Sequence, residues 1–245
     1  MSENTHIIVR SKKDQMSAVH IAINKTKMAT AKVWNPWTSV CESGVNIDSI
    51  KTAAGGGQVP EIIRDGQTIS DIKPVVLRSL GSDLGFNEPV NQSTFEEARK
   101  RARNKYVSVG RANYRSLASG NCTLFACCVI GMLAAQPALL GPGVKVELLN
   151  LVDTEGGSGH AYVVVGRAEG DVKDIGGYGP DCFFIDQWYA RQRRTDPGTR
   201  GVKDATEGGE GNPFWDPAFV PFISHNTTPR LMLTFTSDEL SKLGL

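Results

Sequence analysis

The spacing of hydrophobic and polar residues changes along the chain, and the change predicts where a helix gives way to strands. Residues 123–136 are apolar on every side of a helix, which is typical of a helix buried at the centre of a domain. Gly120 and Asn121 precede this run as a loop and a helix cap. Pro137 and the glycines and proline at 141–143 end it.

Beyond this helix the pattern becomes that of strands. Residues 144–152, 160–168 and 182–190 are rich in β-branched and aromatic side chains and are separated by glycine-rich turns. The polar, glycine-rich residues 191–213 predict a long mobile loop, after which residues 231–236 supply one more strand. A central helix followed by successive strands predicts an α+β fold with an antiparallel sheet.

The first ninety residues carry more mixed signals. Residues 6–10, 18–23 and 31–37 are predicted to be short strands because of their β-branched content. Residues 74–84 are predicted to be a short helix with proline in its first turn. Three consecutive glycines at 55–57 indicate a loop between these elements.

A further helix is predicted to start near Ser93, which lies three residues before Glu96 in the spacing of a capping box. Alanine, arginine and lysine fill its following turns. Its basic side chains are predicted to form a solvated helix face rather than a patch that binds nucleic acid. These basic residues are Arg99, Lys100, Arg101, Arg103 and Lys105.

Composition is that of an ordinary globular chain. The 245 residues are 40% hydrophobic and 22% charged, and 27 Lys and Arg against 26 Asp and Glu leave a formal net charge of +1. This balance gives no electrostatic footprint for nucleic acid or for an anionic membrane. The longest apolar run, about 124–135, is shorter than the roughly 20 residues of a membrane span, so no span is expected.

Cysteine usage and the first residues bear on the compartment. Five cysteines without regular spacing and without a CxxC pair do not resemble a disulfide framework, so reduced thiols are expected. The first fifteen residues lack the basic and apolar regions of a Sec signal peptide. We therefore expect a soluble protein, with export by a route that needs no cleavable signal left open.

Cys122 is the cysteine placed for chemistry. A cysteine reacts as its thiolate, and a helix N-terminus stabilises an anion through its unpaired N–H groups. Cys122 occupies that position, whereas Cys127 and Cys128 fall a turn or more inside the helix and would be desolvated. The backbone N–H groups of Cys122 and Thr123 are the better candidates for an oxyanion hole. Asn121 and Gln58 are weaker candidates for a side chain that supports it.

His160 and Asp186 are the candidate partners of Cys122. His160 opens a predicted strand after a glycine-rich turn, so its ring can project from the sheet edge towards the helix. Asp186 interrupts an apolar run, and a carboxylate beside a buried strand needs a partner such as an imidazolium to offset its desolvation. The three residues then supply a nucleophile, a base and the group that orients the base. Trp188 is expected either to screen the His–Asp pair from water or to be a core aromatic residue.

Three motifs together resemble a known superfamily. "GNC" leading into an apolar helix, "GHAYVVVG" and "FFIDQW" are similar to the papain-like fold in its transglutaminase-like branch. More narrowly, they resemble the bacterial papain-fold toxin and effector domains that act as cysteine proteases or protein-glutamine deamidases. The resemblance covers about residues 115–190 and implies Cys122 as nucleophile, His160 as general acid and base, and Asp186 as orienting carboxylate. Gln187 departs from the family, which often has proline there.

The resemblance implies a papain-like α+β fold, in which a central buried helix carrying the cysteine packs on an antiparallel sheet. It implies a thiol-dependent hydrolase that attacks an amide bond of a protein substrate through a thioester, without a metal or cofactor. Peptide cleavage, glutamine deamidation and transglutaminase-type acyl transfer share this intermediate, so the triad does not separate them. Residues 91–245 are then the catalytic domain, and residues 1–90 an accessory or substrate-recognition region.

The resemblance also implies a biological setting, in which the protein is a bacterial effector or toxin with a role in virulence. Such a protein is secreted without a Sec signal peptide into the cytoplasm of a target or host cell.

Three rival interpretations differ in kind. A non-catalytic binding module on the same scaffold would have no reason to lower the pKa of Cys122. A second site with Asp216 and His225 lacks a nucleophile in a recognisable elbow. A metal site lacks the paired, closely spaced ligands of structural zinc. The residues that would converge there are Cys122, Cys182, His160 and Asp186.

Overall fold

The computed structural model of the chain describes residues 10–35, 40–41, 91–153, 159–195, 214–215 and 227–243. In chain order the elements are α1 (Lys12–Asn24), η1 (Lys27–Ala29), β1 (Lys32–Asn35), β2 (Val40–Cys41), α4 (Gln92–Asn113), β3 (Ser119–Gly120), α5 (Cys122–Ala135), η3 (Pro137–Leu139), β4 (Lys145–Asp153), β5 (Gly159–Val165), η4 (Ile175–Tyr178), β6 (Phe183–Ile185), α6 (Gln187–Thr195), β7 (Phe214–Trp215), β8 (Thr227–Thr236) and α7 (Ser237–Lys242). This mixture of helices and strands confirms the α+β class.

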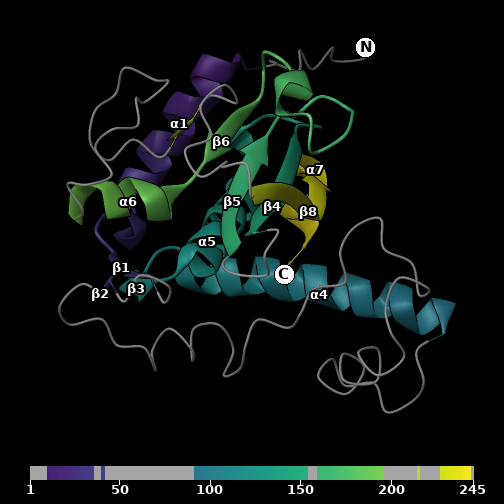
Figure 1. Cartoon of the computed structure of the whole chain (residues 1–245), viewed down its shortest axis with the longest axis horizontal. Coiled ribbons are helices and arrows are strands. Elements are labelled where there is room, and N and C mark those ends of the chain that lie inside the picture. The colour runs from purple at the N-terminus through teal and green to yellow at the C-terminus, as the bar shows by residue number, and fades with distance from the viewer. Residues whose placement is uncertain are drawn as a thin grey trace, which may run out of the picture.

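The main sheet has the strand order β7-β6-β5-β4-β8, and each neighbouring pair is antiparallel. The predicted antiparallel sheet is therefore confirmed (Figure 1). β4 pairs with β5 along the whole of β5, whereas β6 pairs only with Val163–Val165 at the end of β5. The start of β5, at Gly159–Tyr162, thus extends past the end of β6, and among the described strands none pairs with it on that side. The candidate site lies at this edge.

The predicted buried helix is confirmed as α5, which lies behind the sheet in Figure 1. All residues from Leu124 to Ala134 are buried, as expected of a helix with no polar face. α5 contacts β5 on one side and α4 on the other. A Cβ on Gly110 of α4 would lie 1.9 Å from the Cys127 carbonyl oxygen, and one on Gly131 would lie 2.0 Å from the Gly110 carbonyl carbon. The two helices approach this closely because both positions are glycine.

The N-terminal region departs from the sequence prediction. Residues 18–23 belong to helix α1, so the strand predicted there is wrong. Val19, Ala22 and Ile23 are buried at helical spacing, and this periodicity outweighs their β-branched content. The strand predicted at 31–37 is confirmed in its first part by β1. The helix predicted at 74–84 lies outside the described residues, as does nearly all of the strand at 6–10.

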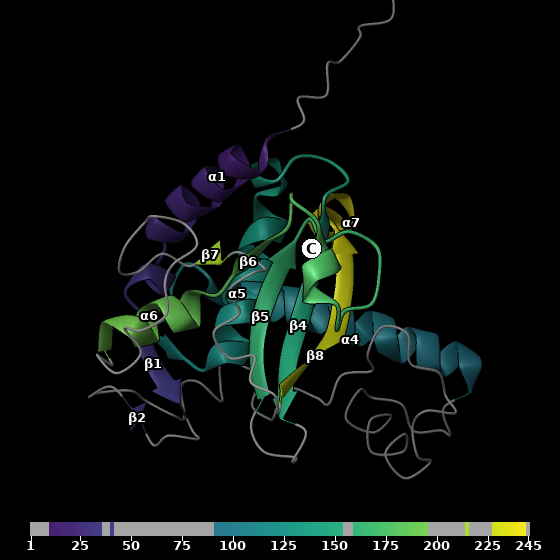
Figure 2. The same cartoon turned by 45° about the horizontal axis from the view of Figure 1, so that its top comes forward.

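α1 and β1 share one hydrophobic core with α5 and the sheet (Figure 2). Val19, Met28 and Val33 belong to this core, and β1 pairs in parallel with β3, directly before the start of α5. The boundary predicted at residue 90 stays a prediction because residues 42–90 lie outside the described ones. The described part of residues 1–90 nevertheless supports the segment that leads to Cys122.

α4 begins slightly earlier than predicted. Its N-cap is Asn91, whose side chain accepts a hydrogen bond of 3.0 Å from the Thr94 N–H, while the Thr94 hydroxyl accepts one of 2.7 Å from the Asn91 N–H. The capping box is therefore Asn91–Thr94, and the pair Ser93 and Glu96 predicted for it is wrong. Asparagine is as good a cap as serine, and local spacing alone does not choose between adjacent candidates.

The strand predicted at 182–190 is the main correction within the sheet. β6 ends at Ile185, and residues 187–195 form α6 instead. Aromatic residues suggested a strand, but Asp186 interrupts it as a helix cap: its Oδ1 accepts a hydrogen bond of 2.9 Å from the Tyr189 N–H. The loop predicted from residue 191 is wrong as far as residue 195, and most of the remainder lies outside the described residues.

The other predicted strands are confirmed with small shifts of their ends. β4 and β5 correspond to 144–152 and 160–168, and β8 starts four residues earlier than the strand predicted from residue 231. β5 ends at Val165 because Gly166 adopts a positive φ of 71°. No described helix combines the length and the apolar character that a membrane crossing needs.

Candidate active site

Cys122 is the first residue of α5, and its neighbours fix the start of that helix. The Asn121 side chain accepts a hydrogen bond of 3.0 Å from the Leu124 N–H, and the Asn121 carbonyl accepts one of 3.1 Å from the Phe125 N–H. A helix has no internal acceptor for the N–H groups of its first turn. The N–H groups of Cys122 and Thr123 are therefore suited to bind an oxyanion, and Asn121 supports them as the cap.

The three cysteines of this segment differ in accessibility. Cys122 is partly exposed, whereas Cys127 is 1% and Cys128 0% exposed. Burial raises the pKa of both buried thiols, so they stay protonated. Within this segment, only Cys122 combines solvent access with the start of a helix.

His160 and Asp186 form a close pair. The Nε2 atom of His160 lies 2.5 Å from Oδ2 of Asp186, and the side chains are 12% and 2% exposed. The other carboxylate oxygen of Asp186 caps α6 through Tyr189. Both oxygens are therefore held, and the carboxylate has a fixed orientation towards the imidazole.

Cys122 lies beside the start of β5, on the side of the strand away from β4. Its Sγ is 4.0 Å from the Gly159 carbonyl oxygen, and it interacts with the His160 side chain and with the Ala161 N–H. Because Asp186 occupies Nε2, Nδ1 is the ring nitrogen that remains for the thiol. The structure thus brings together the three residues predicted from separate motifs. The Cys122 thiol contacts the His160 imidazole, which in turn contacts the Asp186 carboxylate.

The electrostatics of the thiol favour its ionised form. Burial raises the pKa of Cys122, but the hydrogen bond and charge of His160, together with the Ala161 N–H, outweigh it. The net result is that the pKa of Cys122 falls below its usual value. A thiolate therefore forms at lower pH here than on an ordinary cysteine.

The pKa of His160 shifts in the opposite direction from that of Cys122. Burial lowers the pKa of His160, but the charge and hydrogen bond of Asp186, followed by the interaction with Cys122, raise it to about 10. The imidazolium is thus the main form of His160 at neutral pH, and its positive charge stabilises the Cys122 thiolate.

Trp188 lies against the imidazole. It is 5% exposed, and its ring centroid is 5.1 Å from that of His160 with an interplanar angle of 44°. The Tyr162 ring stacks on the same imidazole at 6.1 Å. Trp188 is therefore a core residue that also lies against the imidazole, and its screening of the His–Asp pair from water stays a prediction.

Sequence reasoning missed several backbone groups and supports of the site. The Gly159 carbonyl and the Ala161 N–H border the thiol, and the motif "GHA" around His160 was the signal for both. Gln187, noted only as a departure from the family, donates a hydrogen bond of 3.2 Å from Nε2 to the Met28 carbonyl. It thereby joins the segment after Asp186 to the N-terminal region.

The described residues give little support to the alternative sites. No group of three or more His, Cys, Asp or Glu side chains placed to hold a metal ion occurs there, and Cys182 is buried in the core. Asp216, His225 and Gln58 lie outside the described residues.

Comparison of the chain with family models, curated proteins and solved structures finds no match. What the protein does must therefore be inferred from the geometry of Cys122, His160 and Asp186.

Proposed function

We propose that this protein is a papain-like thiol hydrolase that acts on an amide bond of a protein substrate through Cys122, His160 and Asp186. The observation that carries the proposal is the linked row of side chains: a helix-start thiol with a lowered pKa, an imidazole, and a buried carboxylate 2.5 Å from that imidazole. A binding scaffold has no need of this arrangement, because ionising a partly buried thiol is useful mainly for nucleophilic attack.

Acylation follows from these groups. The Cys122 thiolate attacks the carbonyl carbon of the amide, and the N–H groups of Cys122 and Thr123 stabilise the oxyanion that forms. The C–N bond then breaks as the His160 imidazolium gives its proton to the leaving nitrogen. The products are a thioester on Cys122, a free amine or ammonia, and a neutral imidazole.

Deacylation reverses the role of His160. The neutral imidazole accepts a proton from water as the water oxygen attacks the thioester carbonyl, and the C–S bond breaks to release a carboxylic acid. The thiolate–imidazolium pair is then restored. Asp186 holds the ring in the tautomer and orientation that both steps need.

Peptide cleavage, glutamine deamidation and transglutaminase-type acyl transfer differ only in what leaves and in what attacks the thioester. Protease and protein-glutamine deamidase are the two activities we propose for this site. A secreted bacterial effector or toxin is the setting that the motif resemblance favours, and finding the protein only inside its producing cell would argue against it.

The first experiment measures the alkylation rate of every cysteine against pH by mass mapping, in the wild type and in His160→Ala. We expect Cys122 to react rapidly well below the ordinary thiol pKa of about 8.5 and to lose this reactivity without His160. The buried Cys127, Cys128 and Cys182 serve as internal controls in the same sample. If Cys122 titrates like an ordinary thiol, the hydrolase proposal is wrong and a binding module becomes the better interpretation.

A further inference from the structure

Asn150 of β4 lies beside the candidate site although no motif pointed to it. It is half-buried and pairs with Ala161 of β5 in the sheet register. A Cβ on Gly159 would lie 2.9 Å from both the Nδ2 and the Oδ1 atoms of Asn150. The Asn150 amide therefore occupies the space that a side chain at residue 159 would fill.

This position places Asn150 and His160 on opposite faces of the sheet. Successive residues of a strand point to opposite faces, and Asn150 shares the face of its partner Ala161 and of Gly159. The Gly159 carbonyl oxygen is 4.0 Å from Sγ of Cys122, and the Asn150 amide lies against this same glycine on the face of the sheet opposite to the His160 side chain.

Among the described residues, the Asn150 amide forms no hydrogen bond. Its nitrogen and oxygen are not among the fully buried polar atoms without a partner, so the amide stays accessible. A carboxamide offers two N–H donors and an acceptor oxygen on one planar group. An accessible but half-buried group of this kind is suited to a polar ligand, which would supply the missing hydrogen bonds.

We propose that Asn150 binds the substrate's amide group on the side of Cys122 away from His160, and that the preferred group is a primary carboxamide such as the side chain of glutamine. This inference rests on the proposed hydrolase function. In the bound pair, Nδ2 of Asn150 donates to the substrate carbonyl oxygen and Oδ1 accepts an N–H of the substrate.

The preference follows from amide geometry. A primary carboxamide carries one N–H on the same side as its carbonyl oxygen, so it can form both hydrogen bonds with a second carboxamide. In a trans peptide bond the N–H and the C=O point in opposite directions, so only one of these bonds can form. Asn150 therefore favours glutamine deamidation over cleavage of the main chain.

Two alkylating reagents test this without knowledge of the natural substrate. Iodoacetamide carries a primary carboxamide, and N-methyl-iodoacetamide carries a secondary, trans amide on the same reactive carbon. In the wild type we expect the ratio of the Cys122 alkylation rates, iodoacetamide over N-methyl-iodoacetamide, to be about tenfold larger than the same ratio for a free thiol. One hydrogen bond is worth about this factor. Asn150→Ala is expected to abolish this selectivity while the pH dependence of alkylation stays unchanged.

Matched variants separate recognition from packing. Val152 pairs directly with Gly159 on the same face of β4, so Val152→Ala disturbs the same strand without removing an amide and should keep the selectivity. Gly159→Ala places a methyl group against the Asn150 amide and should lose the selectivity as Asn150→Ala does.

The outcomes distinguish this inference from the hydrolase proposal. If Cys122 is activated in all variants but Asn150→Ala keeps the reagent selectivity, Asn150 has no role in recognition. If the wild type cleaves protein main chains and releases no ammonia from glutamine, the preference for a primary carboxamide is wrong while the hydrolase proposal stands. If Cys122 is not activated at all, the failure lies with the proposed function.

Discussion

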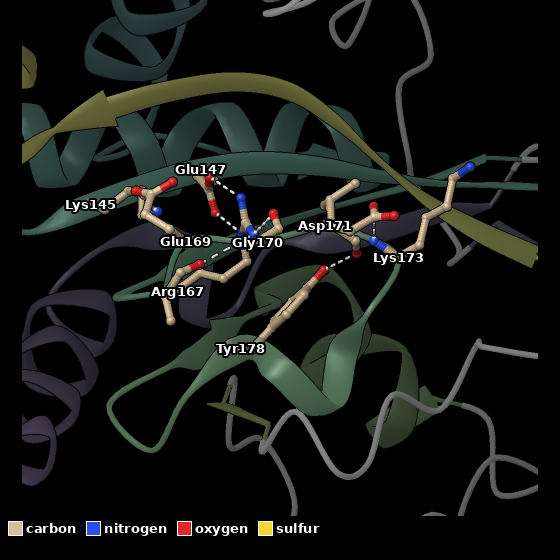
Figure 3. Close-up of polar contacts among 10 residues, drawn as sticks. Lys145, Glu147, Arg167, Glu169, Gly170, Asp171, Lys173 and Tyr178 are labelled. Carbon is tan, nitrogen blue, oxygen red and sulfur yellow. Dashed lines mark hydrogen bonds and ion pairs between the residues drawn. The ribbon is translucent and has the colours of Figure 1, made fainter.

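The two ends of β5 each carry a buried ion pair, and the pairs differ in what surrounds them. Beyond the end of the strand, Arg167 donates to Glu147 from Nε at 2.6 Å and from Nη2 at 2.8 Å (Figure 3). The remaining guanidinium nitrogen, Nη1, donates to the carbonyls of Ala168 and Gly170, and the Tyr178 ring centroid lies 5.3 Å from the guanidinium carbon. All three guanidinium nitrogens donate hydrogen bonds within the protein. This pair therefore stabilises the turn after β5 and leaves no guanidinium nitrogen to bind a ligand.

At the start of β5, His160 and Asp186 form the second pair. We call it the open pair because the imidazole also contacts the Cys122 thiol, and we call the Glu147–Arg167 pair the closed pair. One ring nitrogen faces the carboxylate, and the imidazole also interacts with Cys122, which is partly exposed. A buried ion pair is therefore by itself no sign of function. What sets the His160–Asp186 pair apart is the partly exposed Cys122 thiol that the imidazole contacts.

Removing the charge of Asp186 tests the open pair and should have the largest effect. Asn in Asp186→Asn can still cap α6 but no longer stabilises the imidazolium, so we expect kcat to fall by roughly 10³- to 10⁴-fold. Cys122 alkylation at neutral pH should slow in parallel. Thermal unfolding checks that the fold persists, and a variant with undiminished kcat would show that Asp186 does not orient His160.

Breaking the closed pair should reduce stability instead of catalysis. Glu147→Gln leaves the Arg167 charge buried and unpaired, which is expected to cost about 3–5 kcal/mol of the free energy of unfolding, measured by urea denaturation. The rate of Cys122 alkylation per folded molecule should stay within about twofold of the wild type. Equal losses of stability and thiol reactivity would mean that the two ends of β5 are coupled.

The pH dependence of the reaction tests the roles of Cys122 and His160 in the open pair. The acid limb should lie below the usual thiol pKa because the pKa of Cys122 is lowered, and the alkaline limb should lie near pH 10, where His160 loses its proton. Both limbs are read from kcat/KM against pH. An acid limb at the ordinary thiol pKa would contradict the stabilisation of the Cys122 thiolate by His160.

The stabilities conferred by the two pairs should respond differently to pH. The folded pKa of His160 is raised to about 10 from an unfolded value near 6.5, so its stabilising effect is fully present below about pH 6.5 and is lost as the pH rises towards 10. The hydrogen bond with Glu147 raises the pKa of Arg167 further, so Arg167 stays charged over this range. The free-energy difference between wild type and Asp186→Asn should therefore shrink with rising pH.

The smallest expected effect concerns the shield over the open pair. Trp188→Phe keeps an aromatic ring in the core but admits water towards His160, which weakens the attraction of Asp186 and lowers the pKa of the imidazole. We expect the alkaline limb to move below pH 10 and stability to fall by about 1 kcal/mol. An unchanged alkaline limb would assign Trp188 to packing alone.

Local patterns went far in predicting the fold and the site. Asparagine before an apolar run places Cys122 at a helix start, and glycine before His160 leads into a strand, because capping and strand propensity act over a few neighbouring residues. The same reasoning failed for Asp186, since a carboxylate after aromatic residues ends a strand or caps a helix depending on what packs around it.

The sequence by itself determined that Cys122 lies at the start of a buried helix and that His160 lies on a strand, because periodicity, caps and turns are local properties of the chain. Only the tertiary structure decided that Nε2 of His160 faces Asp186, that the N-terminal helix joins the same core, and that Asn150 fills the gap beside Gly159. These contacts depend on how distant segments pack and on strand register, and no local pattern encodes such distances.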